Sequence, residues 1–133
     1  MLNLNVYSMD ILKIFNSDKE GIRRSHVKNL VTVAMADGRL DIDEWKLLMA
    51  IAKRLGMDEE EIKFIRSNPD QISFVPPKKY DEKVQQIRDL VSVMTIDHII
   101  NQKELELCTK ISLKLDILPQ MVDEILESSH SAR

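Results

Sequence analysis

Residues 30–65 read LVTVAMADGRLDIDEWKLLMAIAKRLGMDEEEIKFI, and residues 90–125 read LVSVMTIDHIINQKELELCTKISLKLDILPQMVDEI. Aligned without a gap, sixty residues apart, the two stretches are identical at nine of thirty-six positions. Chance gives about two to four identities between segments of similar apolar content. Seven identities are apolar and follow helical spacing, and the other two are Asp37/Asp97 and Glu44/Glu104. The pattern predicts an internal duplication of a helical unit.

Composition and spacing favour one all-α domain over residues 1–133. Hydrophobic residues make up 44% and charged residues 31%, with only three glycines and four prolines, which is typical of a compact helical protein. We expect about seven helices: a short N-terminal helix, then two three-helix halves related by a pseudo-twofold axis. The first repeat covers about residues 20–66 and the second about 80–127. Residues 67–79, which hold three of the four prolines, form the linker between them.

Charge and hydropathy exclude several partner classes. The net charge is −3, from 19 basic and 22 acidic residues, which argues against binding to nucleic acid. No apolar run reaches the ~18–20 residues of a membrane span, and the N-terminal residues do not resemble a secretory signal. Cys108 is the single cysteine and cannot form an intramolecular disulfide. We therefore expect a cytoplasmic protein that acts through a protein partner, and the sequence leaves its oligomeric state open.

The repeated acidic turn resembles half of a calcium-binding helix–loop–helix. If Gly38 is position 6 of the twelve-residue loop, then Glu44 falls at position 12, where the bidentate glutamate belongs. Positions 1 and 3 fall on Val33 and Met35, which have no side-chain oxygen. The second copy has a valine and a threonine there. Calcium requires six to eight oxygen ligands, so neither turn is expected to form a calcium loop alone.

Two interpretations of the turns remain open. In the first, the two turns face each other and share one hard divalent cation, Ca²⁺ or Mg²⁺ in preference to Zn²⁺. The candidate ligands are Asp37, Asp41, Glu44, Asp97, Asn101 and Glu104. In the second, these residues only stabilise helix starts: Asp41 and Asn101 act as N-caps, and the two glutamates complete capping boxes without any metal.

The stretch VTVAMADGRLDIDEWKLLMAIAKRLGMDEEEI resembles the signature of the TerB-like, tellurite-resistance-associated domains, which include a domain of a membrane-anchored DnaJ-like co-chaperone. The resemblance rests on Ala36-Asp37-Gly38, Leu40, Glu44 and Leu55-Gly56 and extends over about residues 20–127. The second copy departs from it, with Ile96-Asp97-His98 and with Asp116 in place of glycine. The resemblance implies a duplicated all-helical fold, acidic turns that bind a divalent metal, and a stress-related module.

An enzyme is not expected. The sequence contains no recognisable nucleophile–base pair, phosphate-binding loop or closed metal motif. Cys108 aligns with Leu48 on an apolar helix face, which favours a core residue over a nucleophile. The alternative to a cation-binding module is a metal-independent protein-interaction or scaffold module. An exposed apolar patch containing Trp45 or several methionines would support that alternative.

Overall fold

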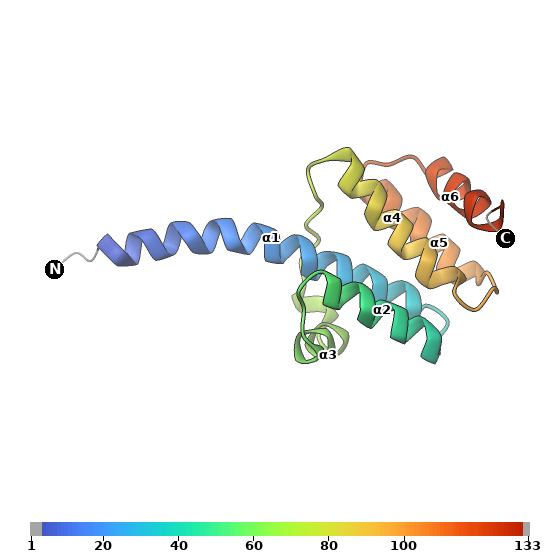
Figure 1. Cartoon of the computed structure of the whole chain (residues 1–133), viewed down its shortest axis with the longest axis horizontal. Coiled ribbons are helices and arrows are strands. Elements are labelled where there is room, and N and C mark those ends of the chain that lie inside the picture. The colour runs from blue at the N-terminus through green and yellow to red at the C-terminus, as the bar shows by residue number, and fades with distance from the viewer. Residues whose placement is uncertain (1–3, 132–133) are drawn as a thin grey trace.

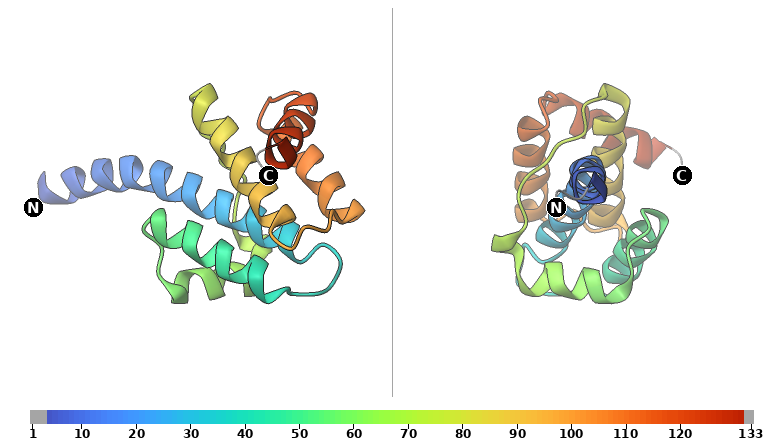
Figure 2. Two further views of the ribbon diagram at one scale, coloured as in Figure 1. Left: turned by 45° about the vertical axis from the view of Figure 1, so that its right-hand side comes forward. Right: turned by 90° about the vertical axis from the view of Figure 1, so that its left-hand side faces the viewer.

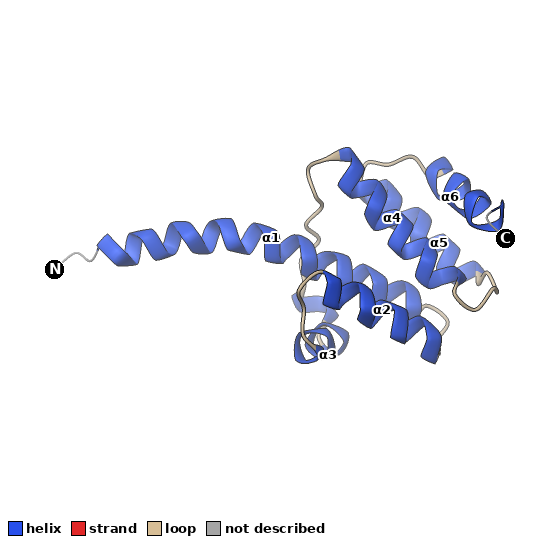
Figure 3. Ribbon diagram, in the orientation of Figure 1, coloured by secondary structure: helices blue, strands red, loops and turns tan. Residues whose placement is uncertain are grey.

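The structure is a computed structural model that describes residues 4–131 of the chain, and side chains for residues 19–129. This range is all-helical and contains no strand (Figure 3), which confirms the expected fold class. The helices are α1 (Leu4–Ala34), α2 (Ile42–Arg54), α3 (Glu59–Ser67), α4 (Tyr80–Thr95), α5 (Gln102–Lys114) and α6 (Gln120–Ser131), with one short 3₁₀ helix, η1 (Pro69–Gln71).

Helix α1 differs from the expectation for the N-terminal region. We expected a short helix followed by a second helix from about Lys19, whereas α1 is continuous over 31 residues. The count within the described range is therefore six α-helices instead of seven. The stretch has no proline, and its one glycine, Gly21, costs only about 1 kcal/mol in a helix interior. Figure 1 shows the N-terminal half of α1 projecting beyond the body of the molecule.

The core lies where α1 meets α4. Leu30 and Val33 of α1, and Leu90 and Val93 of α4, are fully buried. Helix α1 packs against α2, α3, α4 and α5, and α4 packs against α1, α2, α5 and α6. The two views of Figure 2 show α2 and α3 on one side of α1, with α4, α5 and α6 on the other. The central helix pair thus joins the N-terminal and C-terminal parts through one hydrophobic core.

The loops after α1 and after α4 have closely similar backbones. Gly38 has φ 80° and His98, sixty residues later, has φ 64°. At the ends of α2 and α5, Gly56 has φ 86° and Asp116 has φ 61°. All four residues are left-handed, as is common just beyond a helix C-terminus. Each pair of residues sixty positions apart therefore shares the same left-handed backbone conformation.

The segment over residues 67–79 contains η1 and runs back along α1. The backbone N–H of Val75 donates to Ser25 Oγ at 2.9 Å, and Lys28 Nζ donates to the carbonyl oxygen of Ile72 at 3.0 Å. These two hydrogen bonds hold the segment against α1. They satisfy a backbone N–H group and a backbone carbonyl group that are not paired within a helix or a sheet. No helix in the described part of the chain has both the length and the apolar character needed to cross a bilayer.

Candidate functional site

The two acidic turns line one cavity. Its volume is about 440 Å³, and its walls come from the loop and first helical turn at the starts of α2 and α5. All six residues that the sequence singles out lie on its wall, which comprises Asp37, Arg39, Leu40, Asp41, Glu44, Asp97, Ile99, Asn101 and Glu104. The fold therefore brings the two turns to one place, although they lie sixty residues apart in the sequence.

The first aspartate of each turn holds the loop. Asp37 Oδ1 accepts the backbone N–H of Arg39 at 3.0 Å, and Asp97 Oδ1 accepts that of Ile99 at 3.0 Å. This is the aspartate turn that stabilises a tight loop without a strand partner. Each bond uses one carboxylate oxygen, which leaves the other oxygen of Asp37 and of Asp97 for a further ligand.

The cap residues position the helix starts. Asp41 Oδ1 accepts the N–H groups of Asp43 and Glu44 at 2.8 and 3.1 Å. Asn101 Oδ1 does the same for the residues at the start of α5, at 2.9 and 3.2 Å. Asp41 keeps a second anionic oxygen, whereas the remaining group of Asn101 is an amide NH₂, which is a donor. Asn101 is therefore better suited to positioning α5 than to binding a cation.

Glu44 and Glu104 form the floor of the cavity. Each side chain is only 3% exposed, although a carboxylate is rarely buried unless it is paired. The Oε2 atom of each has no hydrogen-bond partner. Capping accounts for one oxygen each of Asp41 and Asn101, but it does not account for these two buried oxygens. A buried polar group without a partner costs about 1–3 kcal/mol and indicates a missing ligand, ion or water.

Burial and the charges of neighbouring carboxyl groups both raise the pKa values of the two glutamates. Burial is the largest cause and raises the pKa of Glu44 to about 7, helped by the charges of Asp97, Asp41 and Asp37. Burial likewise raises the pKa of Glu104 to about 8, followed by the charges of Glu44, Asp37 and Asp97. Each glutamate thus responds to acids of both turns, so the turns act as one electrostatic unit.

A hydrogen bond links the two glutamates when Glu104 carries a proton. As the donor, Glu104 has its pKa raised further, while the bond lowers the pKa of its acceptor, Glu44. When both groups are ionised they can only accept hydrogen bonds, and the bond is lost. A positive charge near the ionised pair would offset the repulsion between the two carboxylates.

The side chains on the cavity wall offer the oxygen ligands that a hard divalent cation prefers, but these oxygens are not yet close enough together to bind one. Five carboxylates and one amide line the cavity, with Arg39 as the basic group on the same wall, and hard cations such as Ca²⁺ prefer oxygen ligands. Among the described side chains, no three His, Cys, Asp or Glu groups are placed so that they could already hold a metal ion. A bound ion would therefore require side-chain rotations that draw the carboxylates inward.

Exposed isoleucines occur in and next to the two turns, and one of them, Ile99, lines the cavity. Ile42 is 69% exposed and Ile99 is 68% exposed, and Ile96 and Ile100 are also exposed. All four lie in or beside the two turns. Trp45, in contrast, is half-buried against the core. The guanidinium of Arg66 lies over its indole ring, 5.1 Å from the ring centroid. The exposed apolar side chains near the turns are thus isoleucines, and not the tryptophan or methionines that the sequence suggested.

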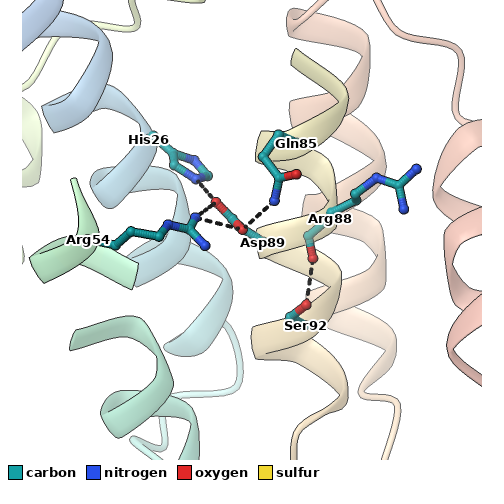
Figure 4. Close-up of polar contacts among 6 residues, drawn as sticks. All are labelled: His26, Arg54, Gln85, Arg88, Asp89 and Ser92. Atoms are coloured by element: carbon teal, nitrogen blue, oxygen red, sulfur yellow. Dashed lines mark hydrogen bonds and ion pairs between the residues drawn. The ribbon is translucent and has the colours of Figure 1, made fainter. Parts of the chain in front are cut away.

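A second buried polar group joins the two parts of the chain, and sequence reasoning missed it. Asp89 of α4 accepts from His26 Nε2 at 2.8 Å, from Arg54 Nη2 at 3.0 and 3.2 Å, and from Gln85 Nε2 at 3.1 Å (Figure 4). Burial by itself would raise the pKa of Asp89, but the bonds and charge of His26, with Gln85 and Arg54, outweigh it and lower the pKa. The only sequence signal was a set of polar residues on otherwise apolar faces.

Comparisons with family models, with curated proteins and with solved structures give no match to this chain.

Proposed function

We propose that this protein is a non-enzymatic, stress-related module of the TerB-like type that binds one divalent cation in the cavity between its two acidic turns. We propose Ca²⁺ or Mg²⁺ as the ion, bound by the free oxygens of the carboxylates Asp37, Asp41, Glu44, Asp97 and Glu104. Asn101 serves as the cap that positions Glu104. The observation that supports the proposal is the pair of buried glutamates on the wall of one shared acidic cavity, each with a buried Oε2 that has no hydrogen-bond donor.

Electrostatics supports a bound cation over an empty cavity. At the slightly alkaline pH where both glutamates would ionise, at least five negative charges share one cavity with a single arginine on its wall. A divalent ion would replace this mutual repulsion with attraction, as bound ions do in other acidic sites. Calcium fits better than magnesium because it tolerates irregular geometry with six to eight oxygens, whereas magnesium requires a near-ideal octahedron.

The matched geometry of the turns supports the proposal that the two halves arose by duplication. Helices α2 and α5 are each 13 residues long, and their caps lie sixty residues apart. The hydroxyls of Thr32 and Ser92, also sixty residues apart, both donate to the carbonyl oxygen four residues earlier, at 2.8 Å. A duplicated unit would bring equivalent turns together and so build one site from two incomplete halves.

The test is a metal titration of chelator-treated protein, followed by melting temperature and calorimetry. Ca²⁺ should give saturable stabilisation, about 2.7 kcal/mol at a hundred times its dissociation constant. The double variant Asp37→Asn, Asp97→Asn should abolish it, because asparagine keeps the loop hydrogen bond and removes the charge. Glu60→Gln on α3 is the control and should bind as the unmodified protein does. Absence of any shift at millimolar Ca²⁺ or Mg²⁺ would count against the proposal.

The second candidate function is a metal-independent interaction module, and the exposed isoleucines in and next to the two acidic turns favour it. In that case Ile99→Asp would abolish binding to a partner, while Asp37→Asn with Asp97→Asn would leave partner binding intact. The cation proposal predicts that Ile99→Ala, which adds no carboxylate to the cavity wall, leaves Ca²⁺ affinity unchanged within about threefold, since Ile99 contributes no oxygen ligand.

A further inference from the structure

A second cavity, of about 180 Å³, lies between α1 and α5 and shares no lining residue with the acidic cavity. Its polar wall consists of Lys28, Asn29, Thr32, Lys110 and Lys114, and its apolar wall consists of Phe74, Leu107 and Ile111. Three lysines therefore converge on one small space, and the lining includes no acidic residue. This is unexpected in a chain whose net charge is −3, because clustered cations repel one another without an anion between them.

Asn29 provides an independent sign of a missing ligand. The residue is only 8% exposed, and its amide nitrogen Nδ2 is buried without a hydrogen-bond partner. An amide nitrogen can only donate, so the group that would satisfy it must be an acceptor. The neighbouring lysine ammonium groups are also donors, and none of them can fill that role.

The hydrogen bonds around Asp89 show which residues occupy the corresponding position between α2 and α4. Sixty residues separate Asn29 from Asp89, and sixty separate Lys114 from Arg54. Arg54 of α2 binds the Asp89 carboxylate on α4 (Figure 4). In the cavity, Lys114 of α5 faces α1, where the corresponding residue is the neutral Asn29. The protein thus supplies its own anion at one position and lacks it at the other.

We propose that this cavity binds a phosphate-type oxyanion, either free phosphate or the phosphoryl group of a small phosphomonoester. Lysine binds phosphate well as a point charge, and three lysines match a dianion better than a monovalent carboxylate. Two of the three lysines are already held in place: Lys28 Nζ donates to the Ile72 carbonyl at 3.0 Å, and Lys114 Nζ lies 5.5 Å from the Phe74 ring centroid. Since an ammonium group has three donors, both retain N–H groups for the anion.

The size of the cavity limits the ligand. Its volume of about 180 Å³ corresponds to roughly six water molecules at ~30 Å³ each in the liquid. A phosphoryl group with its hydrogen-bonded oxygens fits in that space, whereas a whole nucleotide does not. Any larger ligand would place only its phosphoryl group inside the cavity, with the rest of the ligand outside.

The test is an NMR titration of the full-length protein with sodium phosphate, at constant ionic strength maintained with sodium chloride. Phosphate should shift the Asn29 side-chain amide and the Lys110 and Lys114 backbone amides in a saturable manner. Asn29→Asp should abolish the response, because its carboxylate would pair with Lys114 as Asp89 pairs with Arg54. Lys114→Ala should weaken binding at least tenfold. Lys53→Ala, which removes a lysine from the last turn of α2 outside this cavity, is the matched control and should bind normally.

Further ligands identify the source of the oxyanion. Equal affinities for phosphate and glycerol phosphate assign the site to the free ion, and tighter binding of glycerol phosphate assigns it to a phosphomonoester. Acetate should bind at least tenfold more weakly than phosphate. The proposal is overturned if phosphate gives no saturable shift at 20 mM (about a hundred times a 0.2 mM dissociation constant). It is also overturned if acetate binds as well as phosphate, or if folded Asn29→Asp responds as the unmodified protein does.

Discussion

Glu44 and Glu104 lie sixty residues apart in the sequence, yet both side chains are buried in the wall of one cavity and interact directly. The pair links the starts of α2 and α5, which are held by similar caps. Its electrostatic cost governs several measurable properties of the protein.

Stability should fall as the pH rises from about 5 to about 8.5 in the absence of divalent cations. The folded-state pKa values of about 7 and about 8 lie above the ordinary value of 4.5. The folded protein therefore holds protons that the unfolded chain releases, so this stability is fully present below pH 4.5 and is lost as the pH rises through the folded values. The shift of Glu44 alone, from 4.5 to about 7, corresponds to a loss on the order of 3 kcal/mol, since one pKa unit equals about 1.4 kcal/mol, and the shift of Glu104 adds to it. Urea unfolding at several pH values measures it.

Glu104→Gln provides the control for that profile. The substitution removes one of the two carboxyl groups whose pKa is raised, while it keeps the shape of the side chain and a hydrogen-bond donor. The variant should be more stable than the unmodified protein at pH 8 and should show a flatter dependence on pH. A profile that falls as steeply in the variant as in the unmodified protein would assign the pH dependence to other groups.

Protons should compete with a divalent cation for the acidic cavity. Protonated Glu44 and Glu104 cannot coordinate a metal, and with pKa values of about 7 and about 8 they are largely protonated at pH 6. Ca²⁺ should therefore bind at least about tenfold more weakly at pH 6 than at pH 8.5, with proton release on binding. Calorimetry in buffers of different ionisation enthalpy measures that release, and a pH-independent affinity would contradict the assigned ligands.

Asp89→Asn should destabilise the protein by about 2–3 kcal/mol. Asp89 is buried and accepts from His26 and Arg54, and removal of one partner of a buried pair costs about 3–5 kcal/mol. The expected destabilisation lies below that general range because the Arg54 side chain is 56% exposed and solvent screens its charge. Because the pKa of Asp89 is lowered, its contribution is present above the ordinary value of 3.8 and is lost as the pH falls through the lowered value. Arg88→Gln, at the exposed neighbour (Figure 4), should change the free energy of unfolding by less than about 0.5 kcal/mol.

The left-handed residues after α2 and α5 should respond in opposite directions to substitution. Asp116, at φ 61°, carries a side chain and a negative charge at a helix C-terminus, both unfavourable. Asp116→Gly should stabilise the protein by about 0.5–1 kcal/mol, and Gly56→Ala, at φ 86°, should destabilise it by about 1 kcal/mol. Thermal melts measure both changes. Stabilisation by Gly56→Ala would show that the backbone there is not left-handed in solution.

Cys108 should be unreactive towards thiol reagents in the folded protein. Burial, followed by the charge of Glu104, raises the pKa of its thiol to about 12, and only the thiolate is the nucleophile. At pH 8 we expect modification by a disulfide reagent to proceed only through unfolding or local opening, and to become rapid in denaturant. Rapid reaction of the native protein would indicate that α5 opens readily from the core.

Local signals made much of the fold predictable. Asp41 and Asn101 each cap a helix as the sequence indicated, because capping depends on a few adjacent residues. The continuity of α1 was missed, since helix propensity alone does not distinguish one long helix from two shorter ones. The burial of Glu44 and Glu104 was also missed: each occupies a position where a capping box places an exposed glutamate, and only the packing of the two turns encloses them.

The least predictable features depend on residues far apart in the sequence. His26 and Asp89 are separated by 63 positions, and Arg54 and Asp89 by 35. No periodicity or motif relates such residues, because their contact exists only once α1, α2 and α4 have packed together. The lysine cavity is of the same kind, since Lys28 of α1 meets Lys110 and Lys114 of α5 only in the folded chain.

The continuous helix α1 also determines how the molecule moves through water. Its 31 residues span about 46 Å at 1.5 Å per residue, and its N-terminal half extends past the body along the longest axis of the molecule (Figure 1). A body of this shape rotates faster about its long axis than end over end. Amide bonds along α1 should therefore have a different ratio of transverse to longitudinal relaxation rates from those in helices that lie across it. Rotational diffusion would thus report directly on whether the helix continues unbroken from its projecting end into the core.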